Sequence, residues 1–336
     1  MELFDRKKVK VLPISAKISK TRIEDIAVNP DSPVDRLENS RIIEKIADEI
    51  IRARKNNRAV IIAFGAHLIK NGLAPVLRRM IEENYVSHLA TNGAGSIHDW
   101  EFAYHGKTEE DVEKYVAIGQ FGIWDEIGKY INLALVSGAR EGKGYGESIG
   151  EMIHNEELVI DMGKNNEKLK IPHPYKKYSV QEAAFSKKIP FTVHPGYGYD
   201  IIYSHPVCDG AAIGRTSEVD FLSFVNSVSN LEGGVYISIG SAIMSPMIFE
   251  KSLSMARNVA HQEGKKIKDF MIVVNDIKGS DWDFSSGKEP PKDNPAYYER
   301  FCKSFKRMGA RELQYVRADN RYFLLNLYQC VKNRGS

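Results

Sequence analysis

Cysteine is scarce in this chain, and long apolar runs and blocks of like charge are missing. The three cysteines, Cys208, Cys302 and Cys330, form neither a CxxC pair nor a metal-ligand spacing, which favours a reduced, cytoplasmic setting. No stretch approaches the roughly 18 consecutive apolar residues of a membrane span, and the first residues lack the apolar core of a signal peptide. The net charge of +3 is spread along the chain, which argues against nucleic acid as a partner.

Several signatures of known sites are also missing. The sequence contains no GxxxxGK[ST], no HExxH and no GxGxxG, and its histidines and aspartates form no convincing set of metal ligands. We therefore predict no metal site, and any phosphate-binding loop has to be inferred from strand ends rather than from a motif.

Apolar runs alternate with amphipathic segments along most of the chain. The runs at 59–64, 86–90, 189–193, 234–239 and 268–274 are predicted strands, and nearly all of them end in Gly, Ser, Asn or Asp. This alternation predicts an α/β fold with a Rossmann-like, mostly parallel sheet and helices on both faces. We expect an N-terminal arm at 1–35 and a single α/β domain at 36–336.

The segment 59–100 has the pattern of a βαβ unit. Its two strands end at Gly65 and at the run 91–95, TNGAG, where small residues allow the backbone to approach a ligand. The crevice outside the carboxyl ends of parallel strands is the expected ligand site. A second candidate for a pyrophosphate follows the strand at 234–239, where Gly240 and Ser241 precede a helix with Ser245 as its expected N-cap.

Three other polar segments are less specific. The run 137–155 contains five glycines and is interpreted as a mobile loop or lid rather than a phosphate loop. Asp209 and Gly210 fit either a ligand-contacting loop or an ordinary turn. The loop after 274 contains three carboxylates and a tryptophan, which suit a cationic or amine-bearing ligand, although a solvated loop explains them equally well.

Taken in order, these segments resemble the deoxyhypusine synthase family. FGAHLIKNGL at 64–73, ATNGAGSIHDWE at 90–101 and PVCDGAAIG at 206–214 correspond to loops of that family. The small residues at 240–242, the MARN run at 255–258 and the loop at 279–287 continue the match. The resemblance covers roughly residues 36–330 and implies a Rossmann-like sheet that binds NAD and a homotetramer as the assembly.

The resemblance also implies which residues contact NAD. Gly93, Gly95 and Asp209 match dinucleotide-contacting loops, while His67 and Lys70 replace hydroxyl and amide residues of the family. The predicted cofactor-binding residues are Gly65, His67, Thr91, Asn92, Gly93, Gly95, Asp209, Gly210, Gly240 and Ser241.

The catalytic residues of the family are not retained. Ser245, Pro246 and Met247 stand where the family has a histidine pair, and neither Lys288 nor Lys292 has the spacing of its imine-forming lysine. Deoxyhypusine synthesis itself is therefore not expected. An imine needs a lysine that a desolvated pocket keeps deprotonated, which a charged, proline-rich loop does not provide.

We predict an enzyme that binds NAD or a related nucleotide at the strand-end loops and acts on a small, amine-bearing substrate. His98 or His205 would be the general base, because imidazole titrates near neutrality. The predicted catalytic residues are His205, His98 and Asp281, and the predicted substrate-binding residues are Asp276, Asp281, Trp282 and Asp283. The alternative is a nucleotide-binding protein without catalysis on the same fold.

Overall fold

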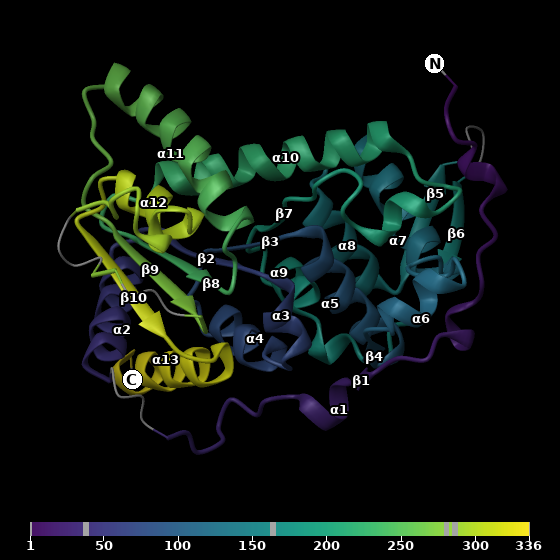
Figure 1. Ribbon diagram of the computed structural model, residues 1–336, viewed down its shortest axis with the longest axis horizontal. Coiled ribbons are helices and arrows are strands. Elements are labelled where there is room, and N and C mark those ends of the chain that lie inside the picture. Colours follow the sequence, from purple (N-terminus) through teal and green to yellow (C-terminus); the bar gives the residue numbers. More distant parts are fainter. Residues whose placement is uncertain (1, 36–39, 162–165, 279–281, 284–287, 336) are drawn as a thin grey trace.

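A parallel sheet forms the centre of the molecule (Figure 1). The computed structural model describes residues 2–35, 40–161, 166–278, 282–283 and 288–335, and within them six strands pair in the order β10-β9-β8-β2-β3-β7. Every neighbouring pair in this sheet is parallel. The strands are β2 (Val60–Phe64), β3 (His88–Thr91), β7 (Phe191–Val193), β8 (Val235–Ile239), β9 (Met271–Asp276) and β10 (Glu312–Arg317).

Helices cover both faces of this sheet, which confirms the predicted fold class. In β2, Ile62 and Phe64 belong to one buried cluster, whereas Ile61 and Ala63 belong to the other. Side chains alternate between the faces of a strand, so a strand covered on both faces is apolar throughout. One face packs against α2 (Ser40–Lys55), α4 (Ala74–Glu82) and α13 (Asn320–Gly335), and the other against α10 (Gly210–Ser229), α11 (Met244–Gln262) and α12 (Arg300–Arg307).

The chain reverses its direction across the sheet between β2 and β8. From β2 it proceeds outward to β3 and β7, and it then returns to the other side of β2 for β8, β9 and β10. In open parallel sheets, ligands bind outside the carboxyl ends of the strands at such a reversal. The loops that follow β2 and β8 therefore flank the expected ligand crevice.

A group of further helices extends the molecule on the right of Figure 1. Among them, α5 begins directly after β3, and the neighbouring helices pack against it. The elements of this part are α1 (Ile23–Ile26), α3 (Ala66–Lys70), α5 (Gly93–His105), α6 (Val112–Ala117), α7 (Asp125–Glu141), α8 (Tyr145–Asn155), α9 (Val180–Ser186), β1 (Thr21–Arg22), β4 (Lys107–Thr108), β5 (Glu157–Asp161) and β6 (Asn166–Lys170). Short 3-10 turns lie at Arg6–Lys8, Ile14–Ala16, Lys176–Tyr178, Ile201–Ser204 and Pro295–Tyr297.

Residues 2–35 lie along the body of their own chain. Strand β1 pairs antiparallel with β4, the backbone of Leu12 forms a bridge with Trp124, and the Val28 N–H donates to the Gly72 carbonyl. Backbone bonds at three separated points thus hold this segment in place. The division into an arm at 1–35 and one domain at 36–336 stays a prediction.

The prediction of a loop or lid at 137–155 is wrong. Helix α7 runs to Glu141 and α8 begins at Tyr145, so the segment is mostly helical. Its glycines serve close packing: a Cβ at Gly146 would collide with the Phe191 carbonyl, and a Cβ at Gly138 would collide with the Ser148 hydroxyl. Glycine occupies these positions because two chain segments approach each other too closely for a Cβ atom.

Three smaller predictions also need correction. The crossover helix of the predicted βαβ unit is divided into α3 and α4 at Gly72, whose φ is +78°. Helix α11 begins at Met244 with Ile243 at its N-cap, so Ser245 lies inside the first turn. The strand β10 was not expected, because Glu312–Arg317 is a half-exposed edge strand without an apolar run.

Among the described residues, no helix combines the length and the apolar character needed to cross a membrane.

Candidate functional site

The loops after β2 and β8 meet at the reversal of the sheet. The Gly65 N–H donates to the Ile239 carbonyl at 3.1 Å, and a Cβ at Gly65 would collide with the Gly240 carbonyl. Gly240 has a φ of +55°, and a Cβ added there would meet no atom within 4 Å. The two strand ends are therefore pressed together, with open space above Gly240. The structure brings the predicted residues Gly65, Gly240 and Ser241 into one place.

Two helices begin near this crevice, and their first turns differ. At the start of α5, the Asn92 side chain accepts the Gly95 N–H at 2.9 Å, and the Asp200 carboxylate accepts the Ala94 N–H. A Cβ at Gly93 would collide with the Asp200 carboxylate, so this acidic side chain lies directly on the helix start. This helix start is a poor anion site, because the Ala94 and Gly95 N–H groups already have acceptors and the Asp200 carboxylate would repel an anion.

The start of α11 is more open. Its N-cap residue, Ile243, makes no side-chain capping bond, and Ala242 and Ile243 are exposed. The Ser241 hydroxyl accepts the Ser245 N–H at 3.2 Å. A 19-residue helix with an exposed start beside Gly240 is suited to a phosphate group, because the N-terminal N–H groups and the helix dipole both favour negative charge.

The other predicted cofactor residues near β2 and β3 have structural contacts. The Thr91 hydroxyl donates to the Phe64 carbonyl at 3.0 Å and thereby links the two strand ends. His67 is exposed on α3, and Lys70 forms an ion pair with Glu109 at 2.5 Å. These residues surround the first strand ends, as the βαβ pattern predicts.

A cavity of about 250 Å³ opens beside the start of α5. It lies between α5, α3, the loop after β7 and the segments around Lys17 and 109–121. Its charged lining consists of Lys17, Lys70, His98, Glu101, Glu109, Glu110 and Asp200. Of the histidines predicted to be catalytic, His98 lines this cavity.

Hydrogen bonds determine which nitrogen of His98 carries the proton. The Thr108 hydroxyl donates to a Glu101 carboxylate oxygen and stands 2.6 Å from His98 Nδ1. A hydroxyl has a single hydrogen, and here it is used toward Glu101, so Nδ1 must donate to Thr108. In the neutral imidazole, Nε2 is then the basic nitrogen. His98 is thus arranged as a base, with its orientation set by Thr108 and Glu101.

The carboxyl groups around the cavity have opposite pKa shifts. Burial raises the pKa of Glu101, but the Lys17 ammonium and His98 outweigh this effect and lower it to about 2. Burial raises the pKa of Asp200 to about 6, with partial compensation from Tyr203 and the Ala94 N–H. A permanently ionised carboxylate behind His98 and a second carboxyl group that titrates near pH 6 are suited to general acid and base chemistry.

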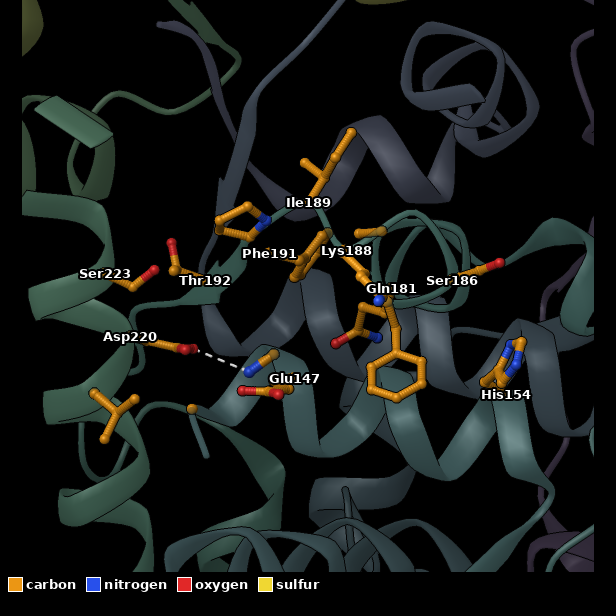
Figure 2. A pocket seen from close by; sticks show the side chains of 16 residues that line it. Glu147, His154, Gln181, Ser186, Lys188, Ile189, Phe191, Thr192, Asp220 and Ser223 are labelled. Atoms are coloured by element: carbon orange, nitrogen blue, oxygen red, sulfur yellow. Dashed lines mark hydrogen bonds between the residues drawn. The ribbon is translucent and has the colours of Figure 1, made fainter. Parts of the chain in front are cut away.

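A larger cavity, about 670 Å³, lies beside the edge strand β7 between α8, α9 and α10 (Figure 2). Its buried carboxyl group, Asp220, accepts the N–H groups of Val193 at 2.7 Å and of Gly146 at 3.0 Å. His154 is bonded to Glu182 at 3.0 Å. These polar groups tie neighbouring elements together, so we place the candidate site in the smaller cavity.

Three predicted residues, His205, Asp209 and Gly210, lie away from the crevice. His205 is 2% exposed, and its Nε2 stands 3.5 Å from Asp125 on α7. Asp209 caps α10 by accepting the N–H groups of Ala211 and Ala212 at 2.8 and 3.0 Å, and Gly210 is the first residue of that helix. Because α10 has 20 residues, its start projects well beyond the strand ends (Figure 1). This placement favours an ordinary helix cap for Asp209.

The acidic loop after β9 is only partly brought to the crevice. Asp276 ends β9, whose residue Asn275 accepts the Gly240 N–H at 3.0 Å. The Trp282 indole packs against the second buried cluster, and its N–H donates to the Lys288 carbonyl at 3.0 Å. Asp281 lies outside the described residues, and Asp283 is exposed. Neither Trp282 nor Asp283 lines the cavity with His98.

Sequence reasoning did not single out Lys17, Glu101, Thr108 or Asp200. No local motif marks them, since they come from four separate parts of the chain. The one available signal was the position of Glu101 three residues after His98, which places both on the same face of a helix. Among the described residues, no group of three or more His, Cys, Asp or Glu side chains is placed to hold a metal ion.

The strand order and the crevice between β2 and β8 define an α/β protein of the Rossmann-like class. Solved structures with the same fold include AgrE in a complex with L-arginine (TM-score 0.51, 18% identity, covering 91% of this chain and 34% of AgrE). Another is a LOR/SDH protein from Methanococcus maripaludis S2 (TM-score 0.50, 16% identity, covering 91% of this chain and 74% of that protein). A ternary complex of AgrE with ornithine and NAD+ has a TM-score of 0.49 and 16% identity, covering 90% of this chain and 34% of AgrE.

This chain spans about a third of the length of AgrE. At these identities the likeness shows the fold alone. No protein-family model matches the sequence, and no curated protein is significantly similar to it.

Proposed function

We propose that this protein is an NAD-dependent enzyme that acts on a small, amine-bearing substrate, with His98 as general base. The observation that carries the proposal is the hydrogen-bonded series His98, Thr108 and Glu101, which opens into an acidic cavity beside the start of α5. In this series Nε2 accepts a proton from the substrate, and the ionised Glu101 stabilises the resulting imidazolium through Thr108.

The cofactor would lie over Gly240 and the start of α11. Gly240 leaves open space, and the helix start offers N–H groups to a pyrophosphate. A bound nicotinamide would supply a hydride acceptor for the carbon beside the amine. AgrE was crystallised with ornithine and NAD+, and both are ligands to test on this protein.

The charge of the cavity favours a cationic substrate. Four carboxyl groups line it against two lysines, and Lys17 and Lys70 are each paired with one of the glutamates. Burial raises the pKa values of Glu110 and Asp200, and an ammonium group bound between them would lower both. The resemblance to deoxyhypusine synthase supports the same substrate class, a transferase or oxidoreductase reaction, a cytoplasmic location and a homotetramer.

Binding and turnover are tested separately. NAD+ should raise the melting temperature of the purified protein and bind in calorimetry. Ala242→Glu adds a negative charge at the start of α11 and should weaken NAD+ binding at least about tenfold, since it repels a phosphate while suiting the helix itself. The matched control, Ser254→Glu, adds the same charge to an exposed position farther along α11 and should leave binding unchanged.

Turnover is followed by the formation of NADH with ornithine, arginine, spermidine and simple diamines. His98→Gln should lower the rate at least about 100-fold with NAD+ affinity retained, because the base is lost and the nucleotide site is untouched. His154→Gln, in the larger cavity, is the control. Absence of NAD+ binding would contradict the proposal, and binding without any turnover would favour the non-catalytic alternative, which the missing lysine and histidine pair of the family also supports.

A further inference from the structure

Lys17 reaches the candidate site from the N-terminal segment. It follows the turn Ile14–Ala16, and the backbone on both sides of it is anchored: the Ile14 N–H donates to Glu126 at 2.6 Å and the Ile18 N–H donates to the Tyr115 hydroxyl at 2.9 Å. Its ammonium group forms an ion pair with Glu101, and each of the two side chains is 2% exposed. A segment at the surface thus delivers one buried charge to the body of the protein.

The pairing matters because Glu101 lies between the Lys17 ammonium and the His98 ring. One of its oxygens is paired with Lys17, and the other accepts from Thr108 and lies 3.3 Å from His98 Nδ1. A buried carboxylate without a cation is strongly unfavourable, and the nearest group able to supply a positive charge by taking up a proton is His98. With Lys17 in place, Glu101 is compensated and His98 is free to remain neutral.

The other carboxyl groups near His98 have partners of their own. Glu109 is paired with Lys70, Glu110 accepts from the Trp124 indole at 2.9 Å, and Asp200 accepts from Tyr203 at 3.3 Å. The charged or titratable groups that face His98 and Glu101 are Lys17, Lys70, His105, Lys107, Glu109, Glu110 and Asp200. Lys17 is the lysine of this set that forms the ion pair with Glu101.

We propose that Lys17 is a positioning residue of the site: it compensates Glu101 so that His98 stays neutral with a basic Nε2, and the site is complete only when the N-terminal segment is docked. The proposal rests on the proposed function in taking His98 as the base. It assigns to Lys17 a role that acts on His98 through Glu101. Docking of residues 14–18 then controls whether the base is active.

The test is a titration of the His98 imidazole by NMR in the folded protein without NAD+ or substrate. In Lys17→Met, the titration midpoint of His98 should rise by about one pH unit or more, because Glu101 is left with His98 as its cation. Lys17→Arg keeps the charge and should return the midpoint to that of the wild type. Lys20→Met removes a lysine that is 53% exposed and paired with Asp111, and it should leave the midpoint unchanged.

A second variant covers the case in which Lys17→Met does not fold. Glu101→Gln leaves the Lys17 ammonium uncompensated, so the His98 midpoint should fall below that of the wild type. An unchanged midpoint in either Lys17→Met or Glu101→Gln would overturn the proposal, as would an equal shift in Lys20→Met.

Because the titration uses no ligand, its result is independent of the proposed function. A shifted His98 midpoint together with absent turnover would refute the proposed enzymatic function but support the coupling between Lys17 and His98 through Glu101. If turnover is found, its rate should rise with pH as His98 loses its proton. Lys17→Met should move this rise to higher pH by the same amount as the titration midpoint, and Lys17→Arg should return it to the wild-type position.

Discussion

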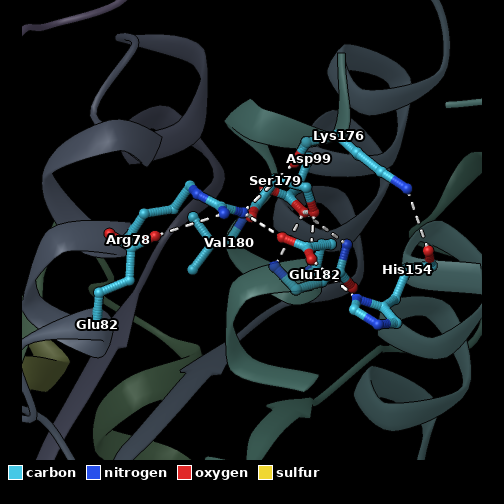
Figure 3. A network of polar contacts seen from close by, with 9 residues as sticks. Arg78, Glu82, Asp99, His154, Lys176, Ser179, Val180 and Glu182 are labelled. Atoms are coloured by element: carbon cyan, nitrogen blue, oxygen red, sulfur yellow. Dashed lines mark hydrogen bonds and ion pairs between the residues drawn. The ribbon is translucent and has the colours of Figure 1, made fainter. Parts of the chain in front are cut away.

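Asp99 and Glu101 are two carboxylates on the same helix, both buried and two residues apart, yet their surroundings differ. Asp99 accepts hydrogen bonds from the Ser179 hydroxyl, the Val180 and Gln181 N–H groups and the Gln181 side chain at 2.6 to 3.2 Å (Figure 3). All of these donors are neutral. Glu101 is held by the Lys17 ammonium, the Thr108 hydroxyl and the nearby His98.

The difference separates a structural carboxylate from one that acts on the cavity. Asp99 joins α5 to the start of α9, and Arg78 strengthens the same junction through Glu182 at 2.5 Å and the Ser179 carbonyl at 2.6 Å (Figure 3). Burial raises the pKa of Asp99 despite its hydrogen bonds, whereas the Lys17 ammonium and the hydrogen bond from His98 outweigh burial at Glu101 and lower its pKa to about 2. Burial by itself therefore does not distinguish the two carboxylates. The charge of the groups that bind each carboxylate distinguishes them.

The largest expected effect concerns the structural carboxylate. Asp99→Ala should lower the free energy of unfolding by about 4 kcal/mol, because several buried donors lose their acceptor at once. Urea denaturation measures this change. Asp48→Ala removes an exposed carboxylate paired with Arg334 and should change stability by less than about 0.5 kcal/mol. A loss at Asp99 no larger than that of the control would show that the α5–α9 junction is not stabilised in this way.

The two carboxylates should also give stability a pH dependence of opposite sign. Glu101 has a lowered pKa when folded, so its contribution is present above pH 4.5 and is lost as the pH falls toward 2. The difference between the pKa values of Glu101 in the unfolded and folded states corresponds to about 3 kcal/mol of unfolding free energy. Asp99 has a raised pKa, so the folded state binds its proton more tightly and the contribution of Asp99 decreases as the pH rises above 3.8.

Unfolding measured from pH 2 to pH 7 tests this opposition. Glu101→Gln should reduce the loss of unfolding free energy at acid pH. Asp99→Asn should reduce the loss of unfolding free energy between pH 4 and pH 7. Equal slopes in the two variants would contradict the assignment of different partners.

The smallest effect is expected at Ser179, which serves both networks of the junction. Its hydroxyl donates to Asp99 at 2.6 Å and accepts the Glu182 N–H at 3.1 Å as the N-cap of α9. Ser179→Ala should cost about 1.5 kcal/mol, in the range of a lost helix cap. Ser186→Ala, at the exposed last position of the same helix, should be neutral and serves as the control.

Much of the sheet was predictable because the signals are local. Apolar runs such as Val60–Phe64 and Val235–Ile239 show strands buried on both faces, and the glycines that follow them mark the places where the chain turns out of the sheet. The edge strand β10 has no such run and was missed. The glycines at 138 and 146 were misread, since a glycine that allows close packing looks the same in sequence as one that allows a turn.

The candidate site was predicted only in part. The βαβ pattern predicts the strand ends, and His98 follows the second of them, whereas His205 and Asp209 lie away from the cavity. Proximity along the chain failed there because the long helix α10 carries its first residues beyond the sheet.

By itself, the sequence determined the α/β class, five strands of the sheet and the small residues at their ends, because apolar periodicity and burial follow from neighbouring residues. Only the tertiary structure decided which groups meet: Asp200 on the start of α5, open space above Gly240, and Lys17 on Glu101 from 84 positions away. Such pairings depend on how separate segments pack, and no local pattern encodes them. The surroundings of His98 show this best, because Lys17 reaches the carboxylate beside its ring from a distant part of the chain.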